Sequence, residues 1–393
     1  MSLMLEFEVE VPAEMAEEFD KKLAYIAEGI ESAIYDPDRR RVRVRLGEGK
    51  VTSQEVLEAR VSEIAQKLRS GYQPGIRRQL AHRVRRSREV RSDPHPLLVA
   101  NGDLHEFGRG RFGLGPKLVA LVRALDELIV NRFSDMNPRA HQFPSLISGE
   151  VLDRCRYLRN FPASLTMVAH LREDLAVLQD FASQVRWNED HLQVPPESAS
   201  PFSVLLAPSV CFHWYAWLGN RQVEGPSVVT ALGKCFRYES TTLSGLERLW
   251  DFSMREVVFV GDPDWIATSR DSALRQGQQV VEDLDLDFEI ATASDPFFID
   301  AYSSQAMYQR GFELKYELLC PLGYRERQLA VGSVNYHQDF FGRALNIEYA
   351  GSPCHTACIG FGLERLALAV LAQHGTEPSG WPATLQDSIG RLA

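Results

Sequence analysis

The expected fold is decided by residues 233–260, which read GKCFRYESTTLSGLERLWDFSMREVVFV. Two runs rich in β-branched and aromatic residues flank an irregular segment, so the stretch predicts two strands joined by a loop. Arg237 and Glu239 lie two residues apart on the first predicted strand and should point to one face, and Phe252 and Glu256 lie on the second. An arginine can contact a phosphate through two hydrogen bonds, and an aromatic ring can stack on a base. By itself, such a pattern more often forms a cross-strand ion pair beside a core phenylalanine.

A second stretch, CIGFGLERLALAV at residues 358–370, adds to this pattern. It places Gly360 and Gly362 directly before a predicted helix, with Arg365 one turn inside it. Glycines let the backbone approach a ligand closely, and an arginine at this position can reach a triphosphate. A pair of glycines alone is weak evidence for a nucleotide site.

The surrounding pattern predicts an α+β fold with a mixed, mainly antiparallel sheet flanked by helices. Between residues 203 and 350 only one long predicted helix, at 263–284, interrupts a series of strand-like runs, namely SVLLAP, KCFRYE, EVVFVG, FEIATA, FELKYELL, QLAVGSVN and LNIEYA. Upstream, the apolar spacing predicts helices at 118–136, 150–158 and about 163–185, and a short extended segment, AHQFPSLIS, at 140–148.

The N-terminal part predicts a small α/β domain, with strands at 3–10 and 39–46 and helices at 14–30 and 53–70. Seven arginines and one glutamate lie between Arg77 and Arg91, as a solvated face or as a docking strip for an acidic partner. We therefore predict two domains. Residues 1–90 form the small domain of unassigned role with its arginine-rich connector, and residues 91–393 form the main domain.

Composition bounds the functional classes. The chain has 393 residues, 45% of them hydrophobic, and no run of eighteen apolar residues, so we expect no membrane span. Six cysteines in a chain of this length do not make a disulfide scaffold, and we expect the reducing cytoplasm. The formal net charge of −10 argues against a general nucleic-acid-binding surface.

These motifs together resemble those of class II aminoacyl-tRNA synthetases. FRYE, the loop and WDFSMRE resemble motif 2, GFGLERL resembles motif 3 about 130 residues later, and AHQFPSLIS with the preceding helix resembles motif 1, which forms the dimer in that family. The resemblance implies a catalytic domain at 91–393 that binds a bent ATP. It assigns the α-phosphate to Arg237, the adenine ring to Phe252, the γ-phosphate to Arg365, the adenine edge to Glu239 and a further phosphate contact to Arg248.

Two cysteines and a glutamate form a candidate metal site. Cys211, Glu256 and Cys358 would leave a fourth zinc position open, as in catalytic sites, and an open zinc can bind a neutral amino group. On spacing alone, ordinary buried thiols are the preferred interpretation. The order and spacing, however, match the zinc ligands of the atypical seryl-tRNA synthetase of methanogens and of its truncated relatives, the amino acid:[carrier protein] ligases. His213 and Cys354 are competing ligands, and the remaining cysteines are expected to be structural, namely Cys155, Cys235 and Cys320.

Residues 312–347 resemble the strand region of seryl-type enzymes that carries substrate and metal-phosphate ligands. The candidates for substrate binding are Lys315, Ser333 and Asn335, and Glu317 is the candidate on the nucleotide side. Gln328 departs from the pattern, because an acid that helps to bind the magnesium ion of ATP is expected there.

The resemblance implies a homodimeric ligase that uses Zn²⁺, Mg²⁺ and ATP to activate a small amino acid, with glycine or alanine favoured. It would transfer the acyl group to the phosphopantetheine thiol of an acyl carrier protein, which residues 165–187 could dock. A seryl-type tRNA ligase is the first alternative; the compact N-terminal unit and the acidic chain make tRNA a less favoured acceptor. The second is a catalytically silent paralogue, which the glutamine at position 328 keeps open.

Overall fold

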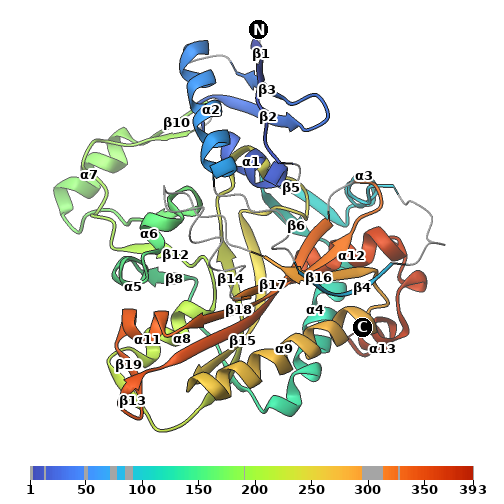
Figure 1. The fold of residues 1–393 in the computed structure, drawn as a ribbon. Coiled ribbons are helices and arrows are strands. Elements are labelled where there is room, and N and C mark those ends of the chain that lie inside the picture. Colours follow the sequence, from blue (N-terminus) through green and yellow to red (C-terminus); the bar gives the residue numbers. More distant parts are fainter. Residues whose placement is uncertain are drawn as a thin grey trace.

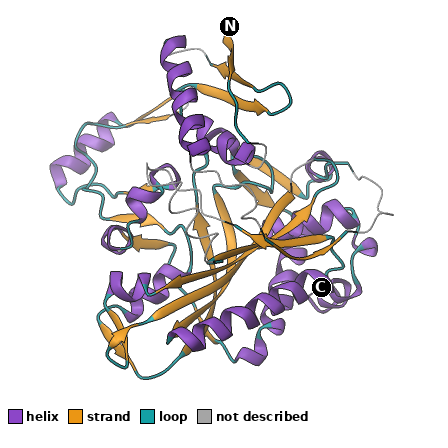
Figure 2. Ribbon diagram, viewed as in Figure 1, coloured by secondary structure: helices purple, strands orange, loops and turns teal. Residues whose placement is uncertain are grey.

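The computed structural model describes residues 3–12, 15–47, 52–70, 78–84, 92–189, 191–293, 313–325 and 328–392. Its centre is an eight-stranded sheet with helices packed against it (Figures 1 and 2). The strands lie in the order β4 (Gln79–Arg83), β16 (Phe288–Thr292), β17 (Lys315–Pro321), β18 (Gln328–Gln338), β21 (His355–Gly362), β15 (Asp251–Gly261), β14 (Ser227–Phe236) and β7 (Arg139–His141). Every pair is antiparallel except β14 with β7, so the predicted mixed, mainly antiparallel sheet is confirmed.

One face of this sheet is covered by α4 (Pro116–Arg132), α9 (Pro263–Asp283) and α12 (Leu363–His374), and α13 (Ala383–Leu392) packs on α4 (Figure 1). Helix α9 begins where the Asp262 carboxylate accepts a 2.9 Å hydrogen bond from the Trp265 amide, and a proline occupies its first turn. Its apolar face is buried in the main core against the strands. The opposite face of the central strands carries polar side chains beside a second apolar cluster that includes Val258 and Val260.

The N-terminal unit is a three-stranded antiparallel sheet, in the order β1 (Leu3–Glu8), β3 (Arg41–Leu46) and β2 (Ile30–Asp36), with α1 (Ala16–Leu23) and α2 (Gln54–Ser70) packed on it. The predicted helix at 14–30 is too long, and strand β2 was missed. The helix ends at Leu23, and Gly29, with a φ of 80°, leads the chain into the strand. Glycine adopts this left-handed backbone without steric cost, which lets the chain turn into the strand.

Three further predictions required correction. The helix expected at about 163–185 begins only at Leu175, in α7 (Leu175–Gln184), because Asp174 caps it, and β9 (Met167–Val168) precedes it. The helix expected at 150–158 is two pieces, α5 (Gly149–Arg154) and α6 (Tyr157–Asn160), separated by the left-handed Arg156 with a φ of 54°. Strand β21 was not predicted, although it lies in the middle of the large sheet and pairs on both sides.

The division predicted at residue 90 remains a proposal. Strand β4 precedes that position but pairs with β16 of the large sheet, and Arg78 donates a 2.6 Å hydrogen bond to Glu313. Residues 78–84 therefore pack with the larger unit. Of the arginine-rich strip, residues 77 and 85–91 lie outside the described residues. Among the described helices, none is long and apolar enough to cross a membrane.

Candidate metal and nucleotide site

The face of the large sheet opposite α9 and α12, called the open face below, carries a row of the predicted site residues. The strand register places Glu317 opposite Ser333, Ser333 opposite Gly360, and Gly360 opposite Glu256. Directly opposed residues in a sheet point to the same face. The absence of a side chain at Gly360 leaves room for the neighbouring glutamate, because a Cβ at that position would lie 3.3 Å from the Glu256 Cγ. The next row contains Cys358, so both sheet-borne metal-ligand candidates share this face.

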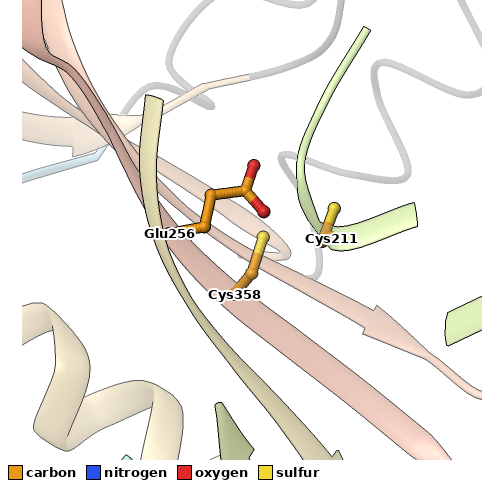
Figure 3. Close-up of side chains that lie close together, drawn as sticks. All are labelled: Cys211, Glu256 and Cys358. Carbon is orange, nitrogen blue, oxygen red and sulfur yellow. The ribbon is translucent and has the colours of Figure 1, made fainter. Parts of the chain in front are cut away.

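Cys211, Glu256 and Cys358 converge, as Figure 3 shows. One ligand atom from each lies within 4.8 Å of the others, and all three side chains are buried. Cys211 comes from the first turn of α8 (Cys211–Leu218), which packs over the open face, and the other two come from the adjacent strands β15 and β21. The Ser209 hydroxyl donates a 2.6 Å hydrogen bond to Oε1 of Glu256, whereas Oε2 is buried without a hydrogen-bond partner among the described residues.

The electrostatics of this group call for a cation. Burial and the nearby Cys358 raise the pKa of Glu256 to about 7. The hydrogen bond between the two thiols, together with burial, raises the pKa of Cys211, and the same hydrogen bond lowers the pKa of Cys358. A buried cluster of three acidic groups is costly when ionised unless a positive charge compensates it.

The donor set fits zinc. Two thiolates and a carboxylate are zinc ligands, and three protein ligands leave a tetrahedral ion one position for a substrate. The partnerless Oε2 of Glu256 is the atom that a bound ion would satisfy. The competing ligands lie elsewhere. Among the described residues, neither His213 nor Cys354 belongs to the metal-ligand group, and the His213 Nε2 lies 3.2 Å from the Leu146 carbonyl instead.

His337 is a neighbour of this group that the sequence did not single out. Its Nε2 lies 3.9 Å from the Cys358 sulfur, while its Nδ1 lies 3.1 Å from the Thr356 hydroxyl and 3.4 Å from the Tyr215 hydroxyl. The Asn335 amide lies 3.7 Å from the same sulfur. Side chains two residues apart on a strand point to the same face, so the prediction made for residues 333 and 335 would also have placed residue 337 on that face.

A cluster of guanidinium groups lies beside the metal group. The Arg237 guanidinium lies over the Phe252 ring, 5.5 Å from its centroid, and its charge offsets a small part of the rise in the pKa of Glu256. Burial lowers the pKa of Arg365, and the positive charges of Arg248 and Arg237 add to this effect. Three neighbouring guanidinium groups suit a polyanion such as a triphosphate.

The backbone that carries these groups differs from the prediction in one respect. Strand β14 ends at Phe236, so Arg237 and Glu239 follow the strand rather than lying on it. The Arg237 side chain donates a 2.9 Å hydrogen bond to the Pro208 carbonyl, and Arg248 donates a 2.5 Å hydrogen bond to Glu239. Arg365 donates a 2.7 Å hydrogen bond to the Glu247 carbonyl, which joins α12 to the loop.

The candidates on β17 and β18 lie on the same face and pair with one another. Lys315 forms a 3.2 Å ion pair with Glu317, and the Asn335 amide donates a 3.2 Å hydrogen bond to Ser333. Gln328 stands where an acid is expected from the resemblance, and its amide donates a 3.0 Å hydrogen bond to Glu289 on β16. A carboxylate therefore lies beside the glutamine, on the neighbouring part of the sheet.

Comparison with known proteins agrees with this geometry. No family model matches the chain. Amino acid--[acyl-carrier-protein] ligase 2 of Bradyrhizobium diazoefficiens is 34% identical over 308 residues, which cover 74% of this chain and 86% of that protein. The type-2 serine--tRNA ligase of Methanococcus maripaludis strain C7 is 28% identical over 328 residues, covering 79% of this chain and 63% of that protein. The crystal structure of A. aeolicus tRNASec in complex with M. kandleri SerRS superimposes with a TM-score of 0.71 at 22% identity, covering 100% of this chain and 77% of that one.

The architecture is thus the class II synthetase fold, of the kind found in the methanogen-type seryl enzyme. Within that class, identity and coverage place the chain in the family of the amino acid--[acyl-carrier-protein] ligases.

Proposed function

We propose that this chain activates a small amino acid with ATP as an aminoacyl-adenylate and transfers the acyl group to the phosphopantetheine thiol of an acyl carrier protein. The observation that carries the proposal is the position of Arg237. Its guanidinium lies over Phe252, the candidate adenine platform, and acts electrostatically on Glu256 of the metal group. An α-phosphate held there would lie between a base site and an amine site.

In the first step the ionised carboxylate of the amino acid attacks the α-phosphorus, and pyrophosphate leaves. Zinc, when bound by Cys211, Glu256 and Cys358, would supply an open coordination position for the α-amino group. Arg237 would stabilise the charge that develops at the α-phosphate, and Arg365 would hold the γ-phosphate. No protein group has to remove a proton in this step, because the carboxylate is already ionised at neutral pH.

The same site proposal assigns further contacts. Phe252 would stack on adenine and Glu239 would orient its edge, while Arg248 would add a phosphate contact. Glu317 would face the magnesium–phosphate side, and substrate contacts would come from Lys315, Ser333 and Asn335. Glycine and alanine are the favoured substrates by resemblance to related ligases.

The carrier-protein acceptor is supported by an exposed apolar arm. We call α7 and the hairpin of β10 (Arg186–Asn188) and β11 (His191–Gln193) the arm; α7 lies to one side of the large sheet (Figure 1). Leu175 is 71% exposed and Trp187 is 70% exposed. Leu175 lies on α7 and Trp187 on β10, and exposed apolar surface of this kind is typical of interaction sites. Arg172 and Arg186 are also exposed there and could attract an acidic carrier protein.

Two assays test the proposal. Amino-acid-dependent ATP–pyrophosphate exchange, run over the twenty amino acids, should respond to glycine or alanine most strongly. Acylation of a phosphopantetheinylated carrier protein, compared with charging of total tRNA, should favour the carrier protein. Strong tRNA charging would instead support a seryl-type ligase, and no exchange with any amino acid would support a silent paralogue.

We further propose a homodimer and a location in the reducing cytoplasm. Strand β7, within the segment that resembles motif 1, ends the large sheet at an edge where a second copy could pair. All six cysteines lie in the described residues, where they are buried and form no disulfide. Sedimentation equilibrium tests the dimer.

A further inference from the structure

The N-terminal unit contacts the loop between β14 and β15, which carries the proposed ATP ligands. The Tyr25 hydroxyl, just beyond α1, donates a 3.1 Å hydrogen bond to the Tyr238 carbonyl. Phe161, the residue that follows α6 in the larger unit, packs against the core of the N-terminal unit. The two units therefore meet at this loop.

Tyr238 lies between Arg237 and Glu239, and its peptide groups are held from two sides. Its amide donates a 3.2 Å hydrogen bond to the Ser164 carbonyl, while its carbonyl accepts from Tyr25. Tyr25 thus holds the peptide unit that leads directly into Glu239. The negative charge of Glu239 also raises the pKa of Tyr25, after the larger effect of burial, which shows how close the two groups are.

The strained backbone of Ser240, the residue after Glu239, depends on contacts that fix the loop. Ser240 has a φ of 50°, in the left-handed region that residues other than glycine rarely adopt. Such a conformation persists only when surrounding contacts fix it. Ser240 begins the short turn η4 (Ser240–Thr242), and the Thr242 hydroxyl donates a 2.7 Å hydrogen bond back to the Glu239 carbonyl.

We propose that Tyr25 is a positioning residue for ATP, through which the N-terminal unit fixes the orientation of Arg237 and Glu239. This inference rests on the proposed function, because it assumes that these two side chains bind the nucleotide. It gives residues 3–70 a role in nucleotide binding without any contact between that unit and the ligand. The Tyr25→Phe variant keeps the ring and removes only the hydroxyl that reaches the loop.

The matched control is Tyr35→Phe. The Tyr35 hydroxyl donates a 3.2 Å hydrogen bond to the Val11 carbonyl and accepts one of 3.1 Å from the Val11 amide, so it acts inside the N-terminal unit. The test is the dissociation constant of Mg–ATP for the full chain, measured by calorimetry without amino acid, together with the KM values in exchange. We expect Tyr25→Phe to weaken ATP binding about 3- to 10-fold, as for one lost hydrogen bond, and to leave the KM for the amino acid unchanged. Tyr35→Phe should lower the melting temperature and leave ATP binding within about twofold.

Equal effects of the two variants, or unchanged ATP binding in Tyr25→Phe, would overturn the inference. A wild-type chain that binds ATP without any exchange would overturn the proposed function, yet the calorimetric comparison would still decide the role of Tyr25. A wild-type chain that does not bind Mg–ATP would overturn both.

Discussion

Replacing Trp187 by alanine should weaken carrier-protein acylation without affecting amino acid activation. Trp187 lies on β10 of the arm, and 70% of it is exposed. A tryptophan presents up to ~250 Å², so about 175 Å² is available to a partner, and at ~25 cal/mol per Å² complete coverage is worth about 4 kcal/mol. Coverage of half that area gives about 2 kcal/mol, or roughly a 30-fold rise in the KM for carrier protein.

The assay compares two reactions of the same preparation. Transfer of a radiolabelled amino acid to phosphopantetheinylated carrier protein reports on docking, and ATP–pyrophosphate exchange reports on activation alone. The control is Phe107→Ala, since Phe107 is 66% exposed on β5 (Leu104–Gly108), outside the arm. An unchanged KM for carrier protein in Trp187→Ala, or an equal rise in Phe107→Ala, would refute the docking role of the arm. A parallel loss of exchange would show that the arm acts on activation instead.

Four further predictions concern the metal, the nucleotide and stability. Cys358→Ser should reduce bound zinc from about one ion per chain to near zero, by metal analysis, since it removes one of three protein ligands. His337→Ala should weaken zinc binding about 10- to 100-fold in a competition assay with a chelating dye, because it removes a neighbour that orients the Cys358 sulfur. Arg365→Ala should lower exchange about 100-fold or more through a higher KM for ATP, because a γ-phosphate contact is lost. Asp126→Ala should destabilise the fold by about 3 kcal/mol in denaturant unfolding, because it leaves the Arg255 guanidinium, bound through two 2.6 Å hydrogen bonds, without its partner.

Each of these has a control variant or an outcome that would contradict it. Cys235→Ser changes a buried cysteine outside the metal group and should keep zinc, so equal zinc loss in both cysteine variants would contradict the ligand assignment. Unchanged zinc affinity in the histidine variant would show that the 3.9 Å contact has no effect on the metal. A normal KM for ATP after loss of Arg365 would remove it from the nucleotide site. Full stability after loss of Asp126 would mean that the pair links α4 to β15 without stabilising the fold.

The sequence allowed the sheet and the metal group to be predicted because both depend on strand periodicity and on motif order. Glu256 and Cys358 lie on neighbouring strands, where the register Glu256–Gly360 places them on one face. What periodicity could not show was that residues 355–362 form a strand at all. That segment is apolar on both faces, since residues 356–361 are all buried, so it lacks the alternation of a half-exposed strand.

The missed features depend on contacts between distant segments. The end of β14 before Arg237 follows from backbone contacts of the loop with Ser164 and Tyr25, which lie far away in the chain. Similarly, the predicted helix starts about three turns later than expected, at Leu175, because the Asp174 cap decides where the amphipathic pattern becomes a helix. Local propensity gives no information on such partners.

Strand β15 sets the distance between the two halves of the proposed site. Phe252 and Glu256 lie on one face of it, four residues apart, and at ~3.3 Å per residue their Cα atoms are about 13 Å apart. Strand β15 therefore fixes the separation between the proposed base platform and the proposed amine anchor. Arg237, in the loop that follows β14, lies over Phe252 at one end of this interval. Under the proposed function, the ligand that spans both ends is an amino acid joined to, or aligned with, a nucleotide. Rigid spacing of this kind favours the in-line attack of a carboxylate on the α-phosphate, since it brings the two reactants together without requiring the protein to move.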